Sequence, residues 1–138
     1  MAVFFLTLGL TVSREQSKID PDLMHTFETK KSVDIMIVLS ESTTKIRQQI
    51  VSRCFNNPEE KRAAIYAGLK EFTDEHQSEI LEFLKNSTSP IGQVRGFWII
   101  NQISGQNASL EIVKELDSTF HDRIGLIREA TSGHTIHT

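Results

Sequence analysis

The chain has little cysteine, little concentrated basic charge and few aromatic residues, and each shortage excludes a class of protein. One cysteine among 138 residues, Cys54, excludes an internal disulfide framework and any zinc site built from several cysteines. Lysine and arginine total 15 against 18 acidic residues, with no basic block, which argues against a phosphate-binding surface for nucleic acid. RNA-binding sheets also need aromatic residues beside basic ones, and that combination is missing.

Motifs that mark an independent enzyme are missing as well. The sequence contains no glycine-rich phosphate loop, no Gly-x-Ser-x-Gly turn and no His-Glu-x-x-His pair. His134 and His137 lie three residues apart near the end of the chain, but no helical pattern is present there to hold them as metal ligands. We therefore expect no catalytic residue, no bound metal and no cofactor.

The one sustained apolar run, within residues 1–13, is too short to span a bilayer. It resembles the hydrophobic core of a secretory signal, although no basic segment precedes it, and a buried strand is the alternative. Asn86 and Asn107 each begin an Asn-x-Ser/Thr triplet, the acceptor pattern for N-glycosylation in secreted proteins. We therefore expect a secreted, extracellular protein that has no membrane partner in its mature form.

A change in composition near residue 32 divides the chain. Residues 14–31 are polar and mixed in charge, which predicts a leader or linker, and residues 131–138 are polar with one glycine, which predicts an extended tail. The stretch between them, 32–130, has the length of one domain with a single hydrophobic core.

The first half of this domain shows one strand pattern and two helix patterns. Residues 33–39 alternate in a period of two and are rich in β-branched side chains, as strands are. Apolar residues four apart over about 43–55 predict a short amphipathic helix, with Cys54 as a small buried hydrophobe on its stripe. Asn57 then offers an N-cap for a long helix, in which His76 lies on the apolar stripe and is expected to be partly buried.

The second half contains the only tryptophan, in the run Val94–Ile103, which is apolar on both faces of a strand. A strand with one covered face should be apolar on one parity only, so each face of this run needs a cover. Because Asn101 tolerates turn geometry, we expect a hairpin here, with strands over 92–99 and 103–106.

A second helix and a last strand complete the domain. Either Asn107 or Ser109 caps this helix, whose apolar residues fall on one side. The strand over 124–129 is expected to place Ile124 and Leu126 on one face. The order strand, helix, strand, strand, helix, strand predicts an α+β, ferredoxin-like (β-α-β-β-α-β) fold, an antiparallel sheet with helices on one face.

Helices on one face leave the other face of the sheet open. Apolar residues from both parities of the tryptophan-containing run, among them Phe97, Trp98 and Ile99, would then meet solvent. An exposed apolar face is typical of a docking surface, so we expect a protein partner there. Which parity faces the partner stays open on sequence grounds.

Three parts of the domain, over residues 32–129, resemble the N-terminal prodomains of secreted subtilisin-like serine proteases, the inhibitor I9 type. The order and spacing of these parts carry the resemblance. They are the strand Val33–Leu39, the helix end Gln77–Leu84, and Phe97–Ile103 followed by Leu110–Leu116 and Ile124–Glu129.

The resemblance implies a domain that binds and inhibits a subtilisin-like protease and assists its folding, with its sheet packed against two protease helices. It implies that Glu129, at the end of the last strand, caps the exposed N-termini of those helices. It also implies that the tail lies in the substrate cleft as an added strand. The tail residues concerned are Thr131, Ser132, Gly133, His134, Thr135 and Ile136.

The chain contains none of the catalytic aspartate, histidine or serine segments of that family. We expect either the front of a longer precursor, which acts on its protease in cis, or a free-standing inhibitor that acts in trans. The tail has no large apolar residue except Ile136, so the residue for the primary specificity pocket is not assigned. The alternative function is a ferredoxin-like interaction module that pairs with itself through the open sheet face.

Overall fold

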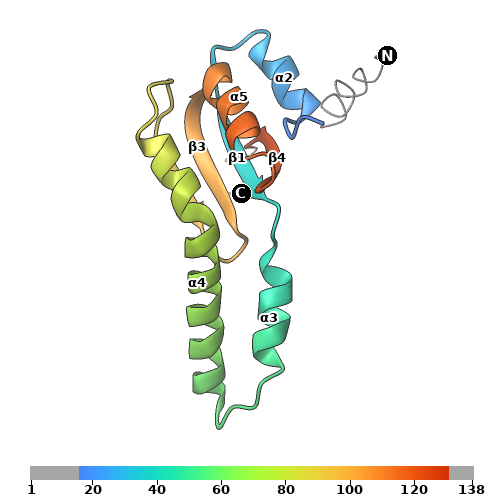
Figure 1. The fold of residues 1–138 in the computed structure, drawn as a ribbon, viewed down its shortest axis with the longest axis vertical. Helices are drawn as coiled ribbons and strands as arrows, with labels where there is room; N and C mark the ends of the chain where they lie inside the picture. The colour runs from blue at the N-terminus through green and yellow to red at the C-terminus, as the bar shows by residue number, and fades with distance from the viewer. Residues whose placement is uncertain (1–15, 131–138) are drawn as a thin grey trace, which may run out of the picture.

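The computed structural model describes residues 16–130, so the signal-like segment 1–13 and the tail 131–138 lie outside the described residues. Figure 1 shows a body built on a sheet and an arm, formed by α3 and the first half of α4, that extends from it. The fold is α+β with a four-stranded antiparallel sheet, which confirms the expected class. In chain order the elements are α2 (Pro21–Phe27), β1 (Ser32–Leu39), α3 (Thr43–Val51), α4 (Pro58–Lys85), β2 (Val94–Phe97), β3 (Gln102–Ser109), α5 (Leu110–Thr119) and β4 (Ile124–Glu129).

The sheet has the strand order β2-β3-β1-β4, and each neighbouring pair runs antiparallel. β1 and β3 are therefore the central strands. Ile37 of β1 lies opposite Ile103 of β3 on one side and Ile127 of β4 on the other, and all three are fully buried. The strands predicted over 33–39 and 124–129 are confirmed.

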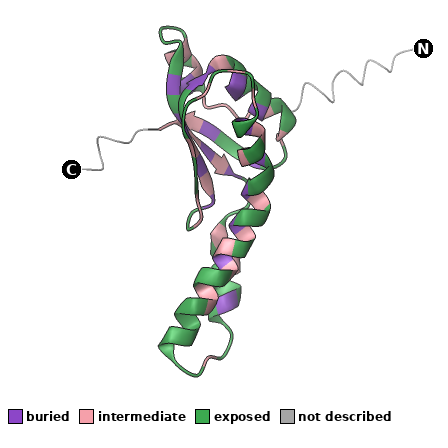
Figure 2. Cartoon of the chain, turned by 90° about the vertical axis from the view of Figure 1, so that its left-hand side faces the viewer, coloured by how far each residue is buried: buried purple, intermediate pink, exposed green. Residues whose placement is uncertain are grey.

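The hydrophobic core lies on one face of this sheet. Ile35 and Ile37 of β1 pack there with Ile80 of α4, Leu116 of α5 and Leu23 of α2, each at 0% exposure. Figure 2 shows the buried residues of the body gathered where the strands and these helices meet. Since α2, α4 and α5 bury their apolar sides against the same sheet face, no described element covers the opposite one.

A β-bulge in β4 decides which of its side chains reach the core. Val38 lies opposite Leu126, but the next residue of β1, Leu39, lies opposite Ile124. Gly125 is therefore an extra residue that turns Leu126 toward the uncovered face. The prediction that Ile124 and Leu126 share a face was wrong for this reason, since only Ile124 is buried.

The segment before β1 belongs to the body, which differs from the leader or linker predicted over 14–31. Asp20 caps α2 through a hydrogen bond from the N–H of Asp22, and Pro21 occupies the first turn. Leu23 on this helix is fully buried in the core. The polar composition concealed this helix, because Leu23 is its one fully buried residue and Phe27 packs only partly against the core.

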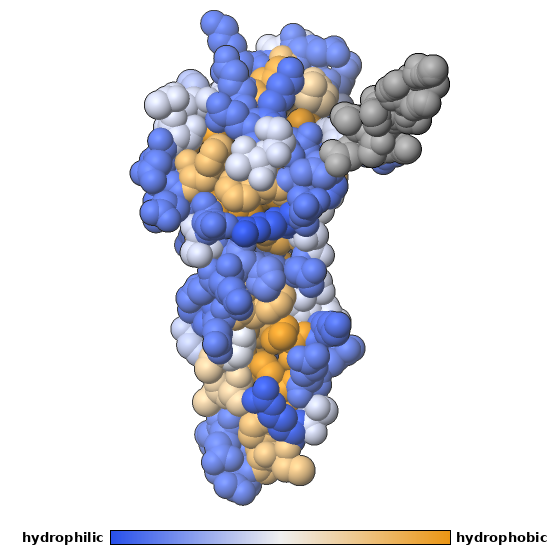
Figure 3. All heavy atoms as spheres, viewed as in Figure 1, coloured by the Kyte–Doolittle hydropathy of each residue, from blue (hydrophilic) through white to orange (hydrophobic). Residues whose placement is uncertain are grey.

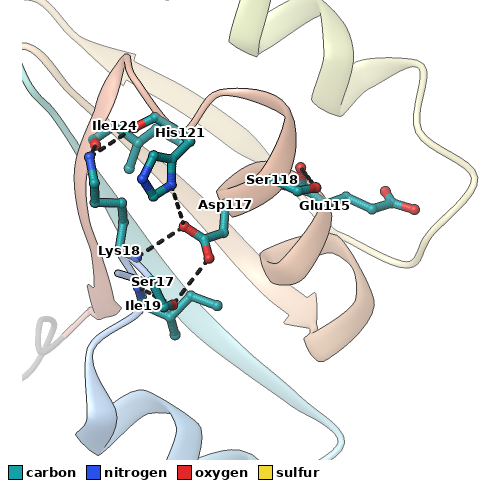
Figure 4. A network of polar contacts seen from close by, with 8 residues as sticks. All are labelled: Ser17, Lys18, Ile19, Glu115, Asp117, Ser118, His121 and Ile124. Carbon is teal, nitrogen blue, oxygen red and sulfur yellow. Dashed lines mark hydrogen bonds and ion pairs between the residues drawn. The ribbon is translucent and has the colours of Figure 1, made fainter. Parts of the chain in front are cut away.

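Residues around Lys18 are bound to the outer edge of β4. The N–H of Ile127 donates to the carbonyl of Lys18 at 2.8 Å, within a short parallel bridge along the strand. The amino group of Lys18 donates to the carbonyls of His121 (2.8 Å) and Ile124 (2.7 Å), and its backbone N–H donates to Asp117 (3.0 Å; Figure 4). One edge of the sheet is therefore covered by the chain itself.

The arm consists of α3 and the first half of α4 packed side by side, and Figure 3 shows apolar side chains along the seam between them. Ile50 of α3 is buried against Gly68 of α4, where a Cβ would lie 2.3 Å from the Ile50 side chain. α3 ends at Val51, earlier than the helix predicted over 43–55, and Cys54 is exposed in the loop that follows. The prediction of a buried Cys54 was wrong because the helix stops before it.

The start signal of α4 acts as predicted, and Ser109 is the one of the two candidate caps that begins α5. Asn57 caps α4 by accepting a hydrogen bond from the N–H of Glu60 at 2.8 Å, and Ser109 caps α5. His76 is half-buried as expected, with its Nδ1 at 2.8 Å from the carbonyl of Phe72. No helix described among residues 16–130 is apolar over a length that would cross a membrane.

Candidate functional site

The sheet face opposite the core, called the open face below, carries the side chains that alternate with the core residues. All of them are exposed or half-buried, and no described helix packs over them. They are Asp34, Met36, Val38, Arg95, Phe97, Gln102, Ser104, Leu126 and Arg128. The open face is therefore accessible to a partner.

The pairing register arranges these side chains in rows across the four strands. One row runs from Phe97 through Gln102 and Val38 to Leu126, and only its glutamine is polar. Leu126 is 36% exposed, which is high for a leucine in a sheet. This row is an apolar band on the surface, separate from the hydrophobic core.

The adjacent row places positive charge beside the apolar band. It runs from Arg95 through Ser104 and Met36 to Arg128, so the two arginines lie on the two outer strands. The Arg95 guanidinium lies 5.7 Å from the ring centroid of Phe97, within the range of a cation–π contact. This charge distribution favours a partner surface with an apolar centre and an acidic rim.

The turn 98–101 between β2 and β3 exposes more apolar surface next to the open face. Trp98 is half-buried, and its ring packs edge-to-face on Tyr66 of α4 with centroids 4.9 Å apart. Ile99 and Ile100 are 52% and 50% exposed. Because these two residues adjoin the apolar band through Phe97, they enlarge one contiguous apolar patch, and such patches mark interaction sites.

The structure separates the predicted docking residues Phe97, Trp98 and Ile99. The strand predicted over 92–99 was wrong at its end, because β2 stops at Phe97 and Asn101 adopts the positive φ of a turn, 53°. Phe97 therefore lies on the open face, Trp98 turns toward α4, and Ile99 points to solvent. The three residues are consecutive in the chain, but their side chains do not lie on one face.

The side-chain amides of Asn101, the last residue of this turn, and of Gln77 in α4 are both buried. Asn101 is 1% exposed and Gln77 of α4 is 4% exposed, and the Nε2 of Gln77 donates to the Oδ1 of Asn101 at 3.0 Å. Sequence patterns marked Asn101 only as a turn residue and did not predict that Gln77 is buried, because glutamine on a helix is normally solvent-exposed. The available signal was its position four residues after Thr73, another polar residue on the buried side of α4.

Glu129, expected to cap partner helices, lies at the end of β4 opposite Ile35, a core residue. Its Oε1 accepts a hydrogen bond from the hydroxyl of Thr26 in α2 at 3.0 Å. The side chain is therefore half-buried on the helix-covered side of the sheet and is not part of the open face. The tail residues 131–136, expected in a substrate cleft, lie outside the described residues.

Both predicted glycosylation sites are on the surface. Asn86 is exposed at the C-terminal end of α4. Asn107 is exposed where the pairing of β3 with β1 is irregular, with φ 50° and its N–H donating to the Asp34 carboxylate at 2.9 Å. Neither asparagine belongs to the core, so the structure leaves both accessible to modification.

Two surface grooves lie away from the open face. One of about 840 Å³ is lined by α4 and α5 and includes Glu79, Glu82 and Glu115. The other, of about 850 Å³, is lined by the connection from α2 to β1 and the start of α5. Neither contains histidine or cysteine, and no three metal-ligating side chains are grouped anywhere in residues 16–130. The open face and its neighbouring turn therefore form the strongest candidate site.

Comparisons with models of protein families, with curated proteins and with solved structures found no match. The open face and the turn 98–101 are thus the features from which a function has to be inferred.

Proposed function

We propose that this chain is a propeptide-like domain that binds and inhibits a subtilisin-like serine protease and assists its folding. The observation that carries the proposal is the open face: helices cover one side of the sheet, and an apolar band lies uncovered on the other. Such a face becomes buried only when a partner covers it. The resemblance of residues 32–129 to I9-type prodomains supplies the class of partner.

We assign the body to the ferredoxin-like arrangement as part of this proposal. The order β2-β3-β1-β4 with antiparallel neighbours throughout supports a split β-α-β topology, in which β3 lies between β1 and β2. α4 and α5 are then the two helices of the arrangement. α3 and the first half of α4, which form the arm, are an addition to it.

Docking in this proposal buries the apolar band against two helices of the protease. Each square ångström of apolar surface removed from water contributes ~25 cal/mol, so Phe97, Val38 and Leu126 supply affinity. Arg95 and Arg128, on the two outer strands, meet acidic groups of the protease. Such pairs accelerate association and fix orientation more than they add affinity.

In this proposal the tail follows β4 into the substrate cleft. Ala130 continues the pairing, since its N–H donates to the carbonyl of Asp34 at 2.8 Å. We place residues 131–136 in the cleft as an added strand, where they inhibit as a bound product does. For Glu129 to cap the partner helices, its carboxylate has to exchange the hydrogen bond from Thr26 on the helix-covered side for the N–H groups of those helices. In this proposal the chain is no enzyme and acts outside the cell, in cis or in trans.

Titrating the purified chain into a subtilisin during peptide hydrolysis tests the proposal. We expect the rate to fall, with an inhibition constant of about micromolar or below, as for other specific protein complexes. A variant ending at Ala130 should still bind through the open face but inhibit more weakly. An unchanged rate at micromolar chain would refute the proposal, and a tight dimer in sedimentation with that result would favour the self-pairing module.

A further inference from the structure

The turn 98–101 exposes apolar side chains, yet polar contacts hold it from several directions. Ile99 and Ile100 gain little burial in the free protein, at 52% and 50% exposure. Fixing them in one conformation therefore adds little to the stability of the fold and removes conformational freedom from the turn. The contacts that fix them come from elements far apart in the chain.

Gln77 is the centre of these contacts. Its Nε2 lies 3.1 Å from the carbonyl of Phe97, 3.0 Å from the Oδ1 of Asn101 and 3.4 Å from the carbonyl of Gln102. One buried side chain of α4 thus holds both ends of the turn. Gly96 makes room for it, because a Cβ at that position would lie 2.4 Å from the Oε1 of Gln77.

Asn101 extends the contacts to the start of the arm. Its φ of 53° lies in the left-handed region, which asparagine adopts more readily than most residues. Its Nδ2 donates to the carbonyl of Glu41 at 2.6 Å, and its carbonyl accepts from the N–H of Leu39 at 3.4 Å. The hydroxyl of Thr43 donates to the carbonyl of Ile99 at 2.7 Å. The turn is therefore bound to β1, to the loop after it and to α3.

We infer that Gln77 and Asn101 are positioning residues, which hold Trp98–Ile100 in the free protein as a preformed contact for the partner that covers the open face. The identity of that partner rests on the proposed function, in which it is a subtilisin-like protease. The turn is continuous with the open face through Phe97, whose carbonyl Gln77 holds. A contact that is already ordered binds more tightly, because association removes less conformational freedom.

Trp98 is the only tryptophan, so its fluorescence reports directly on the turn. Gln77→Met keeps a long side chain but removes the donor, and Asn101→Gly accepts the positive φ but loses both side-chain hydrogen bonds. In the folded full chain, both variants should increase acrylamide quenching of Trp98 toward that of the unfolded chain. Val113→Ala, in the core on α5, controls for a general loss of stability and should leave the quenching unchanged.

The same variants are then titrated into a subtilisin, with the folded fraction measured by circular dichroism. Gln77→Met and Asn101→Gly should raise the inhibition constant about tenfold, as expected when a turn must be ordered on binding. Val113→Ala should change it by less than about twofold, because the two sites are independent.

Wild-type quenching of Trp98 in both amide variants would overturn the inference, and so would an equal loss of inhibition in Val113→Ala. A wild-type chain that fails to inhibit would defeat the proposed function instead. In that case the fluorescence comparison still decides whether Gln77 and Asn101 hold the turn.

Discussion

The two faces of the sheet are formed by alternate residues of the same strands, and the strand β1 is apolar on both. Ile35 and Ile37 are 0% exposed on the core face, whereas Met36 and Val38 are half-buried on the open face. The difference comes from the helices, since α2, α4 and α5 all cover the first face. Apolar sequence therefore marks surface that needs a cover, and only the topology tells whether that cover is internal or a partner.

The largest effect expected from this contrast is on the core face. Ile37→Ala removes a fully buried side chain and should lower the free energy of unfolding by about 2–5 kcal/mol. Val38→Ala, the next residue but on the open face, should lower it by less than about 1 kcal/mol. Urea denaturation followed by circular dichroism measures both. Equal losses would show that the open face supports the fold itself.

The next effect concerns binding through the open face. Phe97→Ala should weaken inhibition of the protease by about 2 kcal/mol, roughly 30-fold, because it removes the largest side chain of the apolar band. Leu126→Ala should act in the same direction. Val51→Ala on α3 is the matched control, since Val51 and Leu126 are 37% and 36% exposed. If Val51→Ala weakened inhibition as much as Leu126→Ala, docking would involve the arm and not the open face.

A smaller effect is expected where the N-terminal segment covers β4. Lys18→Met removes the hydrogen bonds to the carbonyls of His121 and Ile124 and should lower the free energy of unfolding by about 1 kcal/mol. Thermal unfolding measures this loss, and inhibition should stay unchanged. Lys114→Met, at an exposed position of α5, is the control. A loss of inhibition without a loss of stability would assign this segment to the docking surface.

The smallest effect should come from the charges of the open face. Arg95→Gln and Arg128→Gln should each weaken inhibition only about threefold, mainly by slowing association. The difference from wild type should disappear at high ionic strength, because salt screens exposed charges. Stopped-flow association rates at two salt concentrations test this. If the loss of inhibition in one of these variants did not depend on salt, the arginine replaced in it would be buried in the complex.

Element boundaries that depend on neighbouring residues were predictable from the sequence. The alternation over 33–39 matches β1, which spans Ser32–Leu39. The cap at Asn57 was also identified, and Ser109 was one of the two candidates for the cap of α5, because a capping side chain bonds to backbone only a few residues away. These signals are local, and the folded structure does not alter them.

Features that depend on distant partners were not predictable in the same way. The side on which Leu126 lies follows from a bulge in the pairing of β4 with β1, and that pairing has no local signal. Leu23 is the one fully buried residue of α2, which is too little for an apolar pattern to show.

The candidate site was predictable only in outline. An uncovered face near Phe97 followed from the order of elements, but the row that joins Phe97 to Val38 and Leu126 follows from the strand register. The role of Gln77 could not be assigned, because its hydrogen-bond partners lie in the β2–β3 hairpin, 20 to 25 positions further along the chain. Buried amides of this kind are recognised only when their acceptors are known.

The bonds made by Lys18 also have a consequence for the order in which the protein folds. Lys18 and Ile124, joined by one of these bonds, are 106 residues apart, and β1 pairs only with the later strands β3 and β4. The α3–α4 arm and the β2–β3 hairpin need only near neighbours and can form early, whereas contacts between distant segments form slowly. During synthesis β1 therefore stays unpaired until β3 has left the ribosome, and the sheet and the bonds of Lys18 are complete only once β4 has followed.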